Sequence, residues 1–310
     1  MSLPRVSPDS PYFGLPLTNL QSVILTSGPF VFFWSLLRRY ISRARPILEF
    51  GLITHINSLL YAIFSAGLAY LIWQSYFEPE VQIYEFPFQL PILDTKTLVI
   101  ETWMLGYAYH VSKFYEYVDI FNLVAQGLAI STHMAFHHIT TPYLTYSRII
   151  SMPLSSLTTT PTSGWLTHYV SLLPPALVSA LSSPDWRVFA LANSIHHAIM
   201  YAYFSRVPGT EWLRSVIPLT GWLQLALGIG TDALWMFATN GGKDLNSSLA
   251  GSNGSDQEVT NRAISIMLLT RYAMLYWDER TQIVLAEKQG KRRLVRRKQR
   301  EEVEREKKNE

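Results

Sequence analysis

The chain has 310 residues, of which 48% are hydrophobic and 16% are charged, and its formal net charge is +3. Soluble domains carry about 25% charged residues; here charge is concentrated between Lys288 and Lys308, so the remainder is typical of a membrane protein. No basic stripe interleaved with aromatic residues indicates nucleic-acid binding. The absence of cysteine excludes disulfides, cysteine-ligated metals and thiolate nucleophiles.

Seven apolar runs approach the roughly 20 residues that a membrane-spanning helix needs. In chain order they are Leu20–Leu37, Phe50–Trp73, Leu98–Tyr117, Asn122–Ile150, Trp186–Phe204, Trp212–Phe237 and Ala263–Trp277. An eighth run, Trp165–Leu181, is interrupted by Pro174 and Pro175, so length alone leaves seven or eight spans. Residues 1–19 show no cleavable signal peptide, and we expect the first run to act as a signal anchor.

Charge predicts how the chain crosses the membrane. Basic residues follow the first run (Arg38 to Arg45) and fill the tail, so both segments should be cytosolic. The loop after the second run is acidic and suits the lumen. An odd number of crossings follows, and we predict an all-α polytopic membrane protein. It has a lumenal leader at 1–19, seven spans within 20–281 and a cytosolic basic tail at 282–310, with Trp165–Leu181 re-entrant or lumenal.

Two short signals favour the endoplasmic reticulum membrane. Lys307 and Lys308 stand fourth and third from the C-terminal end, as in a cytosolic dilysine retrieval signal. Asn246 and Asn253 begin glycosylation sequons in a loop that this topology places in the lumen. Both signals therefore agree with a lumenal N-terminus and a cytosolic C-terminus.

Ionisable residues at membrane depth are costly and by default mark a functional interior. The first cluster contains Lys113, Glu116 and Asp119, whose spacings of three place them on neighbouring turns of one helix face, where they can pair. In the second cluster, His133 and His137 are four residues apart on one face, whereas His138 turns away by about 100°. An interfacial patch or ordinary packing is the alternative explanation for each cluster.

The third cluster lies in the fifth run, where Asn193 precedes His197 by one turn and its amide could orient that imidazole. Tyr201 and Phe204 would line the same region, and Thr220 to Gln224 add a hydroxyl and an amide to the sixth run. The predicted topology brings the first three clusters to the cytosolic half of the membrane. We therefore expect one shared site that is accessible from the cytosol.

Taken in order, these clusters resemble the ELO family of very-long-chain fatty acid elongases, over roughly residues 50 to 280. Lys113–Asp119 matches the KxxExxDT box with Ile120 in place of the threonine, and His197–Phe204 matches HxxMYxYY with a terminal Phe. Asn193 stands where the family has its asparagine, and Thr220–Gln224 is similar to the TxxQ box with one extra residue.

The chain also departs from the family pattern. Met134 occupies the first position of the HxxHH box, and the nearest histidine, His133, comes one residue earlier. The family's basic stretch after KxxExxD is missing, because Ile120 to Ile130 carries no charge. The chain therefore looks like a divergent member.

The resemblance implies condensation of a long-chain acyl-CoA with malonyl-CoA to a 3-ketoacyl-CoA two carbons longer, without a metal or other cofactor. It implies six helices in a barrel around a closed-end acyl tunnel, with the first helix outside. A histidine nucleophile, forming an acyl-imidazole in a ping-pong scheme, is consistent with the absence of cysteine. The implied partners are the bilayer and the ketoacyl reductase, dehydratase and enoyl reductase of the cycle, and a homodimer is compatible with the sequence.

The resemblance also implies a role for each matching residue. The catalytic candidates are the histidines, with His137 as nucleophile or base, His197 as its partner, His138 beside them and His133 standing in for the missing first histidine. The candidates for substrate binding or for shaping the site are Lys113, Glu116, Asp119, Asn193, Met200, Tyr201 and Gln224. Lys113 would meet a malonyl carboxylate or a CoA phosphate, with Glu116 and Asp119 holding it.

Two other readings stay open at the sequence level. The lost histidine and the lost basic stretch are compatible with an inactive elongase-like protein that binds acyl-CoA. The spacing of His133, His137 and His138 resembles one box of the membrane di-iron desaturases and hydroxylases. That chemistry takes about eight histidines in three boxes, whereas His55, His110 and His168 stand alone here.

Overall fold

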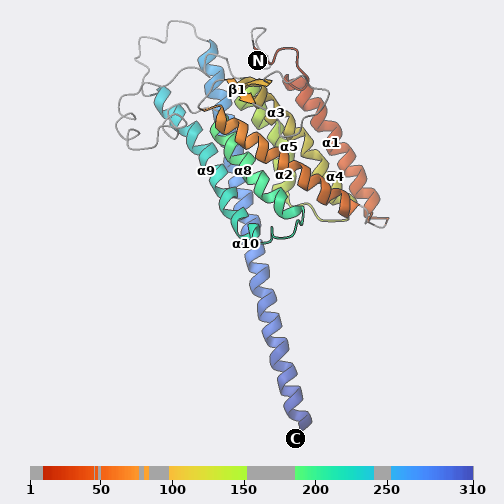
Figure 1. The fold of residues 1–310 in the computed structure, drawn as a ribbon. Coiled ribbons are helices and arrows are strands. Elements are labelled where there is room, and N and C mark those ends of the chain that lie inside the picture. The colour runs from red at the N-terminus through yellow and green to blue at the C-terminus, as the bar shows by residue number, and fades with distance from the viewer. Residues whose placement is uncertain are drawn as a thin grey trace.

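The computed structural model of the chain describes residues 10–44, 46–47, 50–76, 80–83, 98–151, 186–240 and 253–309. The elements in chain order are α1 (Leu20–Ile41), α2 (Phe50–Gln74), β1 (Glu80–Ile83), β2 (Leu98–Glu101), α3 (Thr102–Tyr115), α4 (Tyr117–Ala125), α5 (Thr132–Thr145), the π-helix η1 (Tyr146–Ile150), α8 (Trp186–Phe204), α9 (Leu213–Asn240) and α10 (Asn253–Asn309). The helices form a bundle, and α10 continues beyond it so that the two termini lie at opposite ends of the molecule (Figure 1).

The described part of the chain contains two helices, α1 and α2, that are long and apolar enough to cross a membrane. Both keep large apolar side chains exposed, among them Leu25, Phe32 and Phe33 on α1 and Leu52, Ile63 and Trp73 on α2. Large exposed apolar patches on a protein mark surfaces that meet a partner or a lipid phase. The length, the composition and the exposed apolar side chains of these two helices are those that a lipid phase requires.

Helices α1, α2, α8 and α9 have nearly the bounds of the predicted apolar runs. The seventh run lies inside the longer helix α10, which begins at Asn253, and the third and fourth runs differ from the prediction. The third run was expected to be helical from Leu98, but Leu98–Glu101 is a strand that pairs antiparallel with β1, so the fold is mostly and not purely helical. The run Leu-Val-Ile at its start is rich in β-branched residues, which favour strands. The run Trp165–Leu181 and the Asn246 sequon lie outside the described residues.

The predicted fourth span, Asn122–Ile150, is wrong as a single helix because the chain turns between α4 and α5. Gly127 lies in this turn with φ of +73°, a conformation that costs little for glycine. A Cβ there would lie 2.8 Å from the Pro46 ring, so the turn also packs closely. Ser131 then caps α5, since its side chain accepts a hydrogen bond from the Met134 amide.

Contacts between helices run in a closed cycle. α2 contacts α8, α8 contacts α9, α9 contacts α10, α10 contacts α5, α5 contacts α3, and α3 returns to α2. α1 lies beside α4 and α5, next to this cycle. The main buried apolar cluster takes residues from every helix of the cycle, including Ile72, Tyr109, Leu144, Phe189, Leu225 and Leu269. Segments far apart in the sequence are thus joined in one core.

Gly228 is expected to be intolerant of a side chain, because α9 packs closely against α8 and α10 there. A Cβ at this position would lie 2.7 Å from Phe189 and 2.8 Å from Leu269. Overpacking of this kind costs about 1–3 kcal/mol, so Gly228→Val should lower the thermal unfolding midpoint in detergent. The matched control is Gly230→Val on the same helix, where a Cβ meets nothing within 4 Å. Equal midpoints for the two variants would contradict this packing.

Candidate active site

A buried ion pair lies where α3 meets α4. Lys113 is in the last turn of α3, and Glu116 is the single residue between the two helices. The Lys113 ammonium donates to Glu116 Oε1 at 2.7 Å, and their side chains are 2% and 0% exposed. The ammonium also lies 4.6 Å from the centre of the Tyr109 ring. The predicted pairing of Lys113 with Glu116 is therefore confirmed.

Asn193 of α8 joins this ion pair to two neighbouring helices. Its Oδ1 accepts from Lys113 Nζ at 2.7 Å and from the Tyr109 hydroxyl at 2.9 Å. Because an ammonium can only donate, the amide oxygen must face Lys113. The amide nitrogen then donates to Gln224 Oε1 of α9 at 2.7 Å and faces His197 Nε2 at 3.3 Å. The predicted contact between Asn193 and His197 is thus present.

These partners determine the state of the His197 imidazole. Since Nε2 faces the Asn193 N–H, it serves as the acceptor and Nδ1 carries the proton. That Nδ1 lies 3.2 Å from Glu116 Oε1, which also accepts from the Tyr61 hydroxyl at 2.8 Å. His197 is therefore held with both ring nitrogens engaged, in a site that is closed to water around Glu116.

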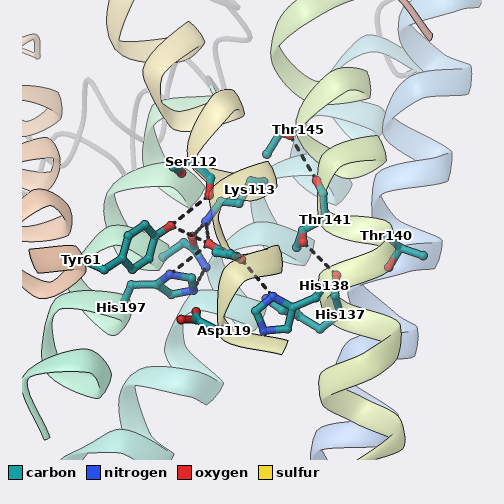
Figure 2. Close-up of polar contacts among 12 residues, drawn as sticks. Tyr61, Ser112, Lys113, Asp119, His137, His138, Thr140, Thr141, Thr145 and His197 are labelled. Atoms are coloured by element: carbon teal, nitrogen blue, oxygen red, sulfur yellow. Dashed lines mark hydrogen bonds and ion pairs between the residues drawn. The ribbon is translucent and has the colours of Figure 1, made fainter. Parts of the chain in front are cut away.

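His138 extends from α5 toward the group that contains Lys113 and His197 (Figure 2). A nitrogen of His137, on the same helix, lies within 4.8 Å of a Glu116 oxygen. His138 Nδ1 lies 3.8 Å from Glu116 Oε2, and neither atom has a hydrogen-bond partner among the described residues. The His137 ring packs edge-on against His138 and against Tyr272, with centroid distances of 5.4 and 5.1 Å. No described residue hydrogen-bonds to the His137 nitrogens. Its ring is half-buried, whereas those of His138 and His197 are buried, so His137 is the most accessible of the three.

His133 lies away from Glu116 and has a different partner. Its Nδ1 is 2.9 Å from Glu279 Oε2 of α10, and its ring centre is 5.9 Å from that of His137. The hydrogen bond from His133 lowers the pKa of Glu279, which lies beyond the apolar part of α10. His133 therefore lies at the edge of the site, beside His137.

The expectation that Asp119 helps to hold Lys113 is wrong. Asp119 lies in the first turn of α4, after the break at Glu116, and it faces a different set of donors. Its Oδ1 accepts from Asn57 Nδ2 at 2.8 Å, and its Oδ2 accepts from the Tyr201 hydroxyl. Asp119 thus fixes Tyr201 and α2 beside the site, and Met200 packs in the same small cluster as Tyr201.

Several residues of the site were not singled out from the sequence. Asn57 and Tyr61 bring polar groups from α2, and Tyr109 does so from α3. A signal was available for the first two, since they stand four residues apart on one face of an apolar helix. His196 is also buried, and its Nδ1 lies 2.8 Å from the Thr220 hydroxyl.

One group of possible metal ligands occurs in the described residues. Glu116, His137 and His197 each offer an atom, and the three atoms lie within 4.8 Å of one another. However, the Lys113 ammonium already occupies Glu116 Oε1 at 2.7 Å. A cation bound there would stand beside another buried positive charge. The donor set therefore suits the ion pair better than a metal ion.

Comparison with known proteins gives no family for this chain. No protein-family model matches it, and no curated protein sequence matches it. The function must therefore be argued from the site. Its distinctive feature is the half-buried His137 imidazole beside a buried network of a lysine, a carboxylate, an amide and two further histidines.

Proposed function

We propose that this chain is a membrane-embedded condensing enzyme of the ELO type, which joins a long-chain acyl-CoA to malonyl-CoA. The observation that carries the proposal is the His137 imidazole, which is available to react beside the buried pair of Glu116 and His197. A chain without cysteine needs another nucleophile for acyl transfer, and an oriented histidine is one of the few alternatives.

The reaction is written in two halves. In the first, a nitrogen of His137 attacks the thioester carbonyl, the C–S bond breaks, and the proton on the other ring nitrogen goes to the sulfur of the departing CoA. In the second, malonyl-CoA loses carbon dioxide, and the resulting enolate carbon attacks the acyl-imidazole. The C–N bond breaks, His137 takes up one proton from the solvent in place of the one that left with CoA, and a 3-ketoacyl-CoA two carbons longer leaves.

The other residues around Glu116 would position the reacting groups in this scheme. The buried carboxylate and Lys113 hold Asn193, which in turn holds His197 in one tautomer. The Glu116 carboxylate, which His197 and His138 flank, would stabilise the positive charge that develops on His137. Because Lys113 is enclosed by Glu116 and Asn193, a positioning role for it is better supported than direct contact with a malonyl carboxylate.

The arrangement of helices supports the architecture that goes with this activity. The closed cycle of contacts from α2 through α8, α9, α10, α5 and α3, with α1 beside it, supports the proposal of a six-helix barrel. The proposal includes seven spans, an acyl tunnel within the barrel, and residence in the endoplasmic reticulum through the terminal dilysine. The next enzymes of the cycle, a ketoacyl reductase, a dehydratase and an enoyl reductase, are the proposed partners.

Incubation of the purified chain in detergent with radiolabelled malonyl-CoA and a panel of acyl-CoAs tests the proposal. We expect a labelled 3-ketoacyl-CoA that depends on acyl-chain length, and one carbon dioxide released per product. A chelator should leave the rate unchanged, since no step uses a metal. Binding of acyl-CoA without carbon dioxide release would replace the proposal with an inactive acyl-CoA-binding protein. Stoichiometric iron in the protein, together with chelator-sensitive oxidation of the acyl substrate, would replace the proposal with an oxidative enzyme.

A further inference from the structure

One face of α10 covers the histidine face of α5. Tyr272, Tyr276 and Glu279 are spaced by four and three residues and so share this face. Tyr272 contacts His137 and donates to or accepts from the Thr140 hydroxyl at 2.7 Å. Tyr276 packs on the His133 ring, with 5.4 Å between the ring centres. Glu279 completes the row, beside the N-terminal end of α5.

Glu279 meets two groups at the beginning of α5. It accepts from His133 Nδ1 at 2.9 Å and also interacts with the hydroxyl of Ser131, the residue that caps this helix. A carboxylate is stabilised at a helix N-terminus, where the unpaired amides carry partial positive charge. Both groups lower the pKa of Glu279, so the carboxylate is ionised at neutral pH.

We infer that Glu279 is a positioning residue that fixes the place and the tautomer of His133, and through His133 the neighbouring ring of His137. This inference rests on the proposed condensation. The histidine of this chain stands one residue before the first histidine of the HxxHH pattern, which turns its side chain by about 100° on the helix. The Glu279 carboxylate holds the displaced ring 5.9 Å from His137, and the proton on Nδ1 leaves Nε2 as the nitrogen with the free lone pair.

The tautomer of His133 is measured without reference to activity, by ¹⁵N spectra of the full chain labelled at histidine. The signals of His133 are those that disappear in His133→Gln. We expect the Nδ1–H form in the wild type, the Nε2–H form in Glu279→Ala, and the Nδ1–H form again in Glu279→Gln, whose amide oxygen still accepts. An Nδ1–H form that persists in Glu279→Ala would overturn the inference even if the chain elongates nothing.

Kinetics on the same proteins separate positioning from packing. Misplacement of a group by about 1 Å can cost about 100-fold, so Glu279→Ala should lower kcat by about this factor and leave KM for malonyl-CoA unchanged. Glu279→Gln keeps an acceptor oxygen and should regain most of kcat. This recovery would show that the loss in Glu279→Ala comes from the missing acceptor and not from misfolding. The control is Asp278→Asn, an exposed neighbour on α10 that should match the wild type. A wild-type kcat in Glu279→Ala, or no recovery in Glu279→Gln, would overturn the inference.

Discussion

Replacing His137 with alanine should lower condensation by about six orders of magnitude, the loss seen when the nucleophilic serine of a protease is removed. The reason is that the ring nitrogens of the other two histidines near Glu116 face other groups of the site. His197 has both ring nitrogens engaged, and His138 is turned toward Glu116 Oε2. Of the three histidines near Glu116, His137 is half-buried, whereas His138 and His197 are buried.

The covalent step is measured with acyl-labelled substrate and no malonyl-CoA. The wild type should release one CoA per chain and retain the acyl label, whereas His137→Ala should do neither. His197→Ala should also abolish elongation, because Glu116 and Asn193 then have no imidazole to hold. The matched control is His55→Ala, whose ring binds the Phe204 carbonyl outside the cluster. Retention of the acyl label by His137→Ala would show that the nucleophile is another residue.

The parts of the site that the sequence predicted are relations within one turn of helix. The spacing of three residues predicted the pair of Lys113 and Glu116, and the spacing of four predicted that Asn193 could orient His197. These pairs follow from helix geometry alone. The same reasoning failed for Asp119, because the helix breaks at Glu116 and the face is no longer continuous.

Contacts between side chains of different helices could not be predicted from such spacing rules. Nothing in the local pattern shows that Glu279 meets His133, a residue 146 positions away in the sequence. The order of the motifs did point to one site, and the structure brings α3, α5, α8 and α9 to it. The partner of each side chain depends on how the helices pack, and this depends on side chains such as Phe189 and Leu269 around Gly228.

Removing one partner of the buried ion pair should destabilise the chain far more than removing both. Glu116→Gln leaves the Lys113 ammonium without a counter-charge, where it is 2% exposed. Such an uncompensated buried charge costs about 3–5 kcal/mol, so the unfolding midpoint in detergent should fall sharply. Lys113→Met leaves Glu116 with the Tyr61 and His197 donors and should cost less.

The double variant Lys113→Met with Glu116→Gln should regain most of this stability, because replacing a buried pair by neutral groups is often close to neutral. It should remain inactive, since Asn193 and His197 lose the groups that orient them. Glu211→Gln, which removes an exposed charge, should change stability by no more than about 0.5 kcal/mol. Additive losses in the double variant would mean that the two groups do not compensate each other, and activity in it would show that the ion pair is structural alone.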